Sequence, residues 1–238
     1  CMITLYQFPA VWDVFSASPF CAKLEAFLRW QEIPHNVVTV ARLKGAPKGK
    51  VPYIEDATGK RGDSGLIIEY LCNLYKLTPD SALSAEQKAI ARGITYLCEE
   101  SIYRIMAYMR FVDPDGWARM QTLLFAKYPG IVRWLIAPRI HKYVKHQLTQ
   151  QGIARHERYQ IVAIGCRDLD ALAALLGDKP YMFGDDMSTV DLTVFSVIGN
   201  LITGPFQHEV ARYAASLSNL AEHTQRVKAR CFQDKTHP

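Results

Sequence analysis

The chain has 238 residues, of which 49% are hydrophobic and 21% are charged, and its formal net charge is +5 at pH 7. This balance excludes a disordered tail, a fibre and a small disulfide-stapled domain. The length allows one large domain or two small ones. A charge excess this small and this dispersed argues against a nucleic-acid-binding protein.

The six cysteines are scattered, without a Cys-x-x-Cys pair and without histidines grouped around them. This pattern predicts reduced thiols and no metal site. The N-terminus lacks the basic region and apolar run of a signal peptide. The most apolar later stretch, residues 190–206, is interrupted by Asp191, Asn200 and Pro205 and is too short for a membrane helix. We therefore expect a cytoplasmic protein without a transmembrane segment.

The first 80 residues alternate between strand and helix patterns. Residues 3–8 alternate as a strand does. Ser18 and Pro19 then open a helix, because Ser is a preferred N-cap and Pro suits the first helical position. Further strands are predicted at 37–40, 51–56 and 60–63, followed by a helix over 64–75. This order, βαβ and then ββα, is the thioredoxin-like layout.

After residue 80 the strand pattern disappears. Helical periodicity covers 86–111, a second helix starts at 113–115, and a third long helix covers 155–176. The segment from Ser188 to Asp191 has the pattern of a capping box and opens a buried helix through Leu201. The predicted fold is therefore α/β plus all-α, with a thioredoxin-like domain at residues 1–78 and an all-helical domain at 84–238.

The first candidate functional feature is the sequence Ser18-Pro19-Phe20-Cys21 between the first strand and the first helix. In redox proteins of this layout a cysteine stands at the position of Ser18. The helix N-terminus there presents free N–H groups and a positive partial charge to a thiolate. A serine cannot exchange disulfides, but its hydroxyl can donate a hydrogen bond to the thiolate of a bound ligand.

Two further features suit a peptide ligand. In the thioredoxin-like layout Pro52 is cis, which frees the backbone N–H and C=O of Val51 to pair with an extended peptide. Asp63 and Ser64 begin a helix, where N–H and hydroxyl groups bind a carboxylate and the acid accepts from an ammonium group. A peptide paired with Val51, with its α-amino acid end at Asp63 and its thiol at Ser18, has the shape of glutathione.

With these residues the chain resembles the cytosolic glutathione-transferase family. Residues 5–9, 18–25 and 48–54 further resemble the branch that contains the failed-axon-connections proteins and metaxins. The resemblance implies a homodimer that binds glutathione as co-substrate and conjugates its thiolate to a small apolar electrophile. It also implies roles for six residues, with Ser18 catalytic, Lys50, Val51 and Pro52 at the glycyl and cysteinyl parts, and Asp63 and Ser64 at the γ-glutamyl end.

The same resemblance implies a second-substrate pocket between the two domains. Its expected lining is aromatic and comes from the loop 9–17 and the first helices of the C-terminal domain. The candidates are Trp12, Phe15, Tyr103, Tyr108 and Trp117, with Arg104 and Phe111 beside them.

Two alternatives stay open at this point. Metaxin-like members work in protein import, so the chain could instead be a non-catalytic binding or scaffold protein of this fold. The second alternative is a glutathione-dependent thiol reductase or peroxidase that uses Cys21. The alternatives differ in whether Ser18, Tyr6 or Cys21 contacts the thiol. We expect Tyr6 in the core of the first strand and Cys21 as a buried structural thiol on the apolar stripe of its helix.

One run of basic residues has almost no acidic counterpart. We expect it to form a solvated helical face, with a membrane surface or an acidic partner as the alternative. Its members are Arg133, Arg139, Lys142, Lys145, Arg155 and Arg158.

Overall fold

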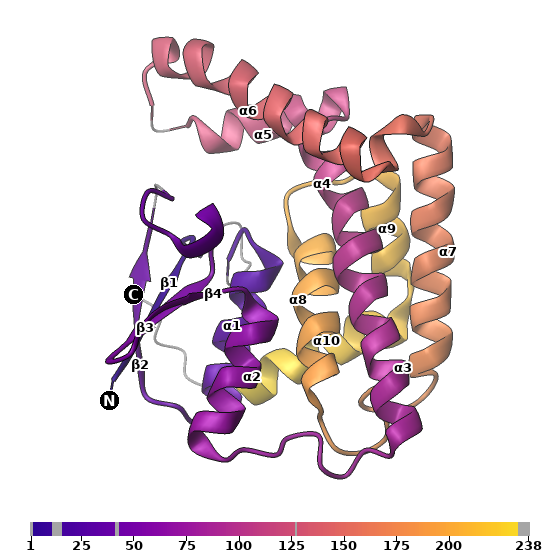
Figure 1. Ribbon diagram of the computed structural model, residues 1–238. Helices are drawn as coiled ribbons and strands as arrows, with labels where there is room; N and C mark the ends of the chain where they lie inside the picture. Colours follow the sequence, from indigo (N-terminus) through magenta and orange to yellow (C-terminus); the bar gives the residue numbers. More distant parts are fainter. Residues whose placement is uncertain (1, 11–15, 41–42, 127, 233–238) are drawn as a thin grey trace.

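The computed structural model describes residues 2–10, 16–40, 43–126 and 128–232. A mixed four-stranded sheet with the strand order β2-β1-β3-β4 forms one side of the molecule (Figure 1). Its strands are β1 (Ile3–Gln7), β2 (His35–Thr39), β3 (Tyr53–Asp56) and β4 (Gly59–Gly62). β1 and β2 are parallel, whereas β3 is antiparallel to both β1 and β4. The thioredoxin-like prediction is therefore confirmed.

Two helices cover one face of this sheet. α1 (Pro19–Trp30) connects β1 to β2, and α2 (Ser64–Tyr75) follows β4. Leu5 on β1 packs with Phe27 on α1 and Leu71 on α2, and all three are completely buried. Two short 3-10 turns lie in connecting segments: η1 (Pro47–Gly49) precedes β3, and η3 (Ile153–Arg155) lies in the helical part of the chain.

Tyr6 lies on the opposite face of the sheet, so the prediction that it belongs to the core was wrong. Successive side chains of a strand point to opposite faces, and the buried residues of β1 are Ile3, Leu5 and Gln7. Tyr6 is half-buried and stacks on Tyr53 with 4.4 Å between the ring centroids. Strand alternation reveals two faces, but it does not tell which of them a helix covers.

The rest of the described chain is helical. α3 (Ala85–Tyr96), the π-helical turn η2 (Leu97–Ile102) and α4 (Tyr103–Phe111) form the continuous helical segment predicted at 86–111. The remaining helices are α5 (Pro114–Leu124), α6 (Gly130–Gln151), α7 (Arg158–Leu176), α8 (Thr189–Thr203), α9 (Glu209–Ser216) and α10 (Ser218–Cys231).

α8 connects the two halves of the core. Val194 and Ile198 pack in the helical core, whereas Leu192 and Phe195 pack with Leu5 and the other apolar residues under the sheet. Every residue from Val190 to Leu201 is buried. Because both cores use one helix, the sheet and the helical part should unfold together.

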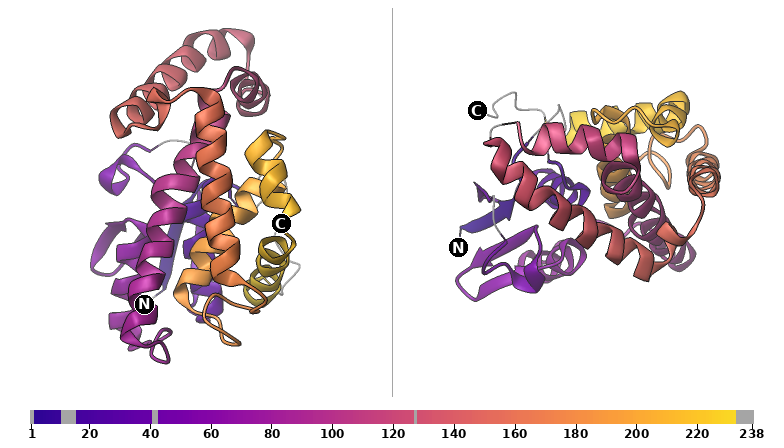
Figure 2. Two further views of the ribbon diagram at one scale, coloured as in Figure 1. Left: turned by 90° about the vertical axis from the view of Figure 1, so that its right-hand side faces the viewer. Right: turned by 90° about the horizontal axis from the view of Figure 1, so that it is seen from above.

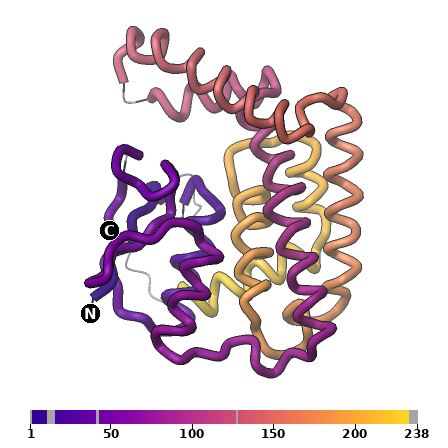
Figure 3. The backbone as a smooth tube through the Cα atoms, viewed as in Figure 1, coloured from indigo at the N-terminus to yellow at the C-terminus, as the bar shows by residue number. Residues whose placement is uncertain are grey.

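α5 and α6 leave the bundle as a pair, and we call residues 114–151 the arm. Figure 3 shows the chain running outward along α5 and returning along α6 to α7, above the sheet-containing part. Figure 2 shows the same pair from above, lying across the bundle. Within the described ranges, no helix combines the length and apolarity needed to cross a bilayer.

Candidate functional site

The pairing of the strands brings the predicted site residues to one edge of the sheet. Tyr6 near the end of β1 pairs with Tyr53 at the start of β3, and Tyr53 pairs with Gly62 at the end of β4. Pro52 directly precedes Tyr53, and Asp63 directly follows Gly62. The N-terminus of α1 lies at the same edge, because Ser16 Oγ donates to the Phe8 carbonyl at 3.3 Å and accepts from Ser18 N–H at 3.3 Å.

Ser18 holds the N-cap position of α1, as predicted. Its carbonyl accepts from the N–H groups of Cys21 and Ala22, each at 3.1 Å. Its side chain makes no capping hydrogen bond to the helix backbone. Ser18 is half-buried, and its hydroxyl interacts with the Cys21 thiol one turn into α1 rather than with the backbone N–H groups of the helix.

Cys21 is completely buried, which confirms the prediction of a structural thiol. Burial raises the pKa of this thiol, although hydrogen bonds with the Phe8 backbone and with the side chains of Ser18 and Ser16 partly oppose the shift. A reactive thiol needs exposure and a lowered pKa. This environment disfavours the reductase alternative. The described cysteines are all free.

Asp63 combines a capping role with an unusual backbone conformation. Its Oδ1 accepts from Gly65 N–H at 3.0 Å and from Leu66 N–H at 3.1 Å. Oδ2 accepts from no other group in the described ranges, so it is available to an ammonium group. The φ angle of 85° is costly for a residue with a side chain, and such conformations gather at functional sites. Ser64, the next residue, is buried at 4% exposure.

The segment before β3 completes this edge. The Val51–Pro52 peptide bond is cis, as the thioredoxin-like layout predicts. Lys50 is exposed and extended, and it follows the η1 turn that packs against Gly62 of β4. Lys50 therefore stands beside Val51 with its ammonium group accessible to an anion.

The predicted second-substrate residues lie in three separate places. Tyr103 meets the N-terminus of α1, with its ring edge-on to Phe20 at 4.9 Å between centroids. Burial raises the pKa of the Tyr103 phenol, while the charges of Arg104 and Arg110 oppose the shift. Tyr103 is thus a neutral hydrogen-bond donor beside Cys21.

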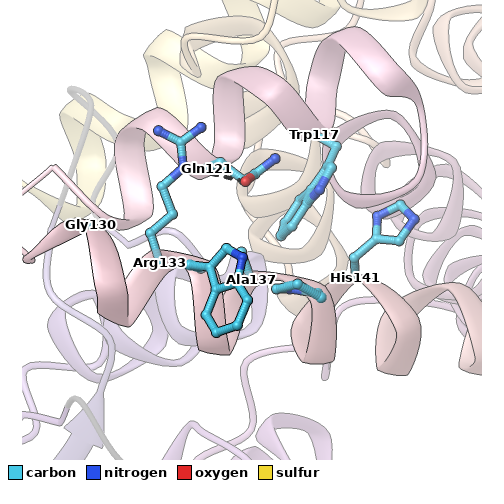
Figure 4. A pocket seen from close by; sticks show the side chains of 8 residues that line it. Trp117, Gln121, Gly130, Arg133, Ala137 and His141 are labelled. Atoms are coloured by element: carbon cyan, nitrogen blue, oxygen red, sulfur yellow. Dashed lines mark hydrogen bonds between the residues drawn. The ribbon is translucent and has the colours of Figure 1, made fainter.

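Tyr108 is at the other end of α4. Burial raises the pKa of its phenol, and Asp113 raises it further. Trp117 belongs to the arm, where it faces His141 at 5.2 Å between ring centroids in a pocket of about 520 Å³ between α5 and α6 (Figure 4). Trp12 and Phe15 lie outside the described residues. The structure thus brings only Tyr103 of these three to the Ser18 edge.

Three residues that sequence reasoning missed tie the helical part to this edge. Asn200 on α8 donates from Nδ2 to the Ser16 carbonyl at 3.2 Å, and Arg110 on α4 donates to the Asn200 carbonyl at 2.7 Å. Ser16 and Arg110 are almost fully buried, and burial lowers the pKa of Arg110 to about 10. The available signal was Asn200 itself, a polar residue inside an otherwise apolar helix. A partly buried ion pair of Lys23 with Glu99, at 2.6 Å, links α1 to η2.

Curated relatives match most of the chain. It is 28% identical to Failed axon connections of Drosophila melanogaster over 98% of its length, and it spans 59% of that relative. It is 29% identical to the isoprene-epoxide–glutathione S-transferase of Rhodococcus sp. strain AD45, covering 95% of this chain and 98% of the relative. Human metaxin-2 is 23% identical over 89% of this chain and 81% of the relative.

Solved structures and family models agree on the fold. A glutathione S-transferase of Methylobacterium radiotolerans in complex with glutathione sulfonate superposes with a TM-score of 0.61 at 19% identity, covering 97% of this chain and 92% of that one. The model of the glutathione S-transferase N-terminal domain matches residues 19–116, and that of the C-terminal domain matches residues 165–227. The chain therefore belongs to the glutathione S-transferase family.

Proposed function

We propose that this protein binds glutathione and conjugates its sulfur to a small apolar electrophile. The observation that carries the proposal is the meeting of Ser18, Val51 and Asp63 at one edge of the sheet, with a Ser18 hydroxyl that does not cap its own helix. The likeness to a Rhodococcus protein named for an epoxide–glutathione reaction supports the same class of chemistry.

In this proposal each end of the peptide has its own partner. Asp63 Oδ2 accepts from the γ-glutamyl ammonium group, and the N-terminus of α2 with Ser64 takes the adjacent carboxylate. The backbone of Val51, ahead of Pro52, pairs with the cysteinyl part, and Lys50 attracts the glycyl carboxylate. Three separate anchors leave the sulfur at the N-terminus of α1, beside Ser18.

Ser18 stabilises the thiolate. Its hydroxyl donates to the sulfur, and the N-terminal dipole of α1 favours the negative charge. Each unit by which the thiol pKa falls corresponds to about 1.4 kcal/mol of preference for the thiolate. The thiol proton leaves to solvent, the sulfur forms a bond to the electrophilic carbon, and the leaving group departs with the electrons of its bond. With an epoxide, the C–O bond opens and the oxygen takes up a proton.

The test is the Ser18→Ala variant, measured for conjugation of chloro-dinitrobenzene and for glutathione binding by calorimetry. We expect kcat/KM to fall about 10- to 100-fold, since a hydrogen bond to a charged group contributes about 1.5–3 kcal/mol. Glutathione binding should change by only a few fold. Ser84→Ala is the control, because Ser84 caps α3 far from this edge.

The alternative outcomes are distinct. Absence of glutathione binding by the unaltered protein would overturn the proposal. Activity that survives Ser18→Ala and disappears in Cys21→Ala would favour the reductase. Binding without turnover would favour the non-catalytic alternative, which the likeness to metaxin-2 supports. We further propose a cytoplasmic homodimer, and light scattering of the purified chain tests its mass.

A further inference from the structure

The arm has a charge composition unlike the rest of the chain. Its residues 114–151 contain six Lys and Arg residues and one acidic residue, Asp115. Within the arm, Arg139, Lys142 and Lys145 are exposed along α6. Arg139 donates to the Leu135 carbonyl of its own helix. This partner is a neutral carbonyl group, so the bond leaves the positive charge of Arg139 in place. The surface therefore carries a positive field that faces solvent.

The outer end of the arm is apolar and exposed. Trp134 is 71% exposed, Ile131 61% and Tyr128 54%, and Leu135 and Ile136 are also exposed. Exposed large apolar side chains of this kind are normally single, and a group of them marks an interaction surface. Ile131, Trp134 and Leu135 are three and four residues apart at the start of α6 and therefore form one patch on one face of the helix, with Tyr128 just before it. We call it the tip.

The tip and the cations follow one another along α6. The apolar residues occupy the first two turns of α6, and the cations Arg139, Lys142 and Lys145 follow in the next two. α6 also forms the outer border of the molecule on this side (Figure 1). Ile131 and Lys142, like Trp134 and Lys145, are eleven residues apart, about three full turns of α-helix, so they share one face of α6 that a flat surface can reach.

Arg158 does not contribute to this field, although the sequence groups it with the same basic run. It donates to Asp113 at 2.6 Å and, through both terminal nitrogens, to Glu209 at 2.7 and 2.8 Å. Its charge is neutralised and its role is to fasten α7 to α5 and α9. Of the other cations in the run, Arg155 lies in η3 beyond the arm, and the remaining four lie on α6.

We propose that the arm docks on the surface of an anionic lipid bilayer. Trp and Tyr side chains favour the boundary between headgroups and hydrocarbon, where an aromatic body meets water. Lys and Arg beside them attract anionic headgroups, and their long apolar stems let the charge stay at the headgroup level. The tip enters the interface, α6 lies along it, and the rest of the protein stays in water.

The experiment is co-sedimentation of the full chain with sucrose-loaded vesicles of phosphatidylcholine alone or with 30% phosphatidylserine, at low and high salt. We expect binding to the anionic vesicles, weak binding to the neutral ones and loss at high salt. The double variant Ile131→Asn/Trp134→Asn should weaken binding at least tenfold. Lys142→Gln/Lys145→Gln should weaken it about fivefold for each cation removed.

Matched controls separate this surface from general effects. Tyr96→Asn/Leu175→Asn removes two exposed apolar side chains from α3 and α7, and Lys88→Gln/Arg167→Gln removes the same charge elsewhere. Both should bind like the unaltered chain. Equal binding to neutral and anionic vesicles, or equal losses in the controls, would overturn the proposal. The proposal would also be overturned if the unaltered chain did not bind vesicles and its dimer dissociated in Ile131→Asn/Trp134→Asn. A second copy of the chain would then cover the tip.

Discussion

Asp191 is a completely buried carboxylate that accepts four hydrogen bonds, and its removal gives a quantitative prediction. Oδ1 accepts from Met182 N–H and from His223 Nε2, each at 2.8 Å. Oδ2 accepts from Ser188 N–H at 2.8 Å and from the Ser188 hydroxyl at 2.7 Å. Asp191 and His223 are both completely buried. The carboxylate therefore joins the start of α8, α10 and the turn before α8.

Replacing Asp191 by Ala leaves four buried donor groups without their acceptor. An unsatisfied buried polar group costs about 1–3 kcal/mol. Because the four groups share one site and partly relax together, we expect a loss of about 4 kcal/mol in the free energy of unfolding. This is a large share of the roughly 5–15 kcal/mol that folded domains possess.

Urea unfolding followed by circular dichroism measures this loss. With an m-value of about 3 kcal/mol/M, the midpoint of Asp191→Ala should fall by roughly 1.3 M. α8 belongs to both halves of the core, so the sheet and the helices should lose structure in one transition. Asp186→Ala, an exposed aspartate in the same turn, is the control and should change little. A loss below about 1 kcal/mol for Asp191→Ala would refute the reasoning.

Two other sites give stability predictions. Burial lowers the pKa of His208 to about 4, and its Nδ1 must stay unprotonated to accept from Ala211 N–H. Unprotonated His208 thus contributes about 3 kcal/mol to the free energy of unfolding above pH 6.5. This contribution disappears as the pH falls to about 4. His208→Asn caps without titrating and should remove that part of the pH dependence of urea unfolding; an unchanged dependence contradicts this. A Cβ on Gly116 would lie 1.6 Å from the Met109 carbonyl oxygen, so Gly116→Ala should cost about 3 kcal/mol. Gly93→Ala has open space and should stabilise by about 0.5–1 kcal/mol, so equal shifts in Tm would contradict the steric argument.

The residues of the candidate site differ in how far local sequence reveals them. Ser18 and Asp63 are visible because helix starts have a chemical signature within four residues. Asn200 and Ser16 meet across 184 positions, and no local pattern encodes that contact. Trp117 carries the right residue type for a substrate pocket, but the departure of α5 from the bundle places it against His141 instead.

The sequence by itself determined the order of elements, the capping box at Ser188 and the position of Ser18 at the start of α1, because these depend on neighbours within one or two turns. Only the tertiary structure decided which face of β1 is covered, which core each side of α8 joins, and where the arm points. Those outcomes depend on packing between segments that are distant in the sequence, such as β1 with α2 and α8, where the free energy comes from burying surfaces that one segment does not contain. The basic run follows the same division, since Arg139, Lys142 and Lys145 are exposed on α6 while Arg158 is paired with Asp113 and Glu209 in the fold.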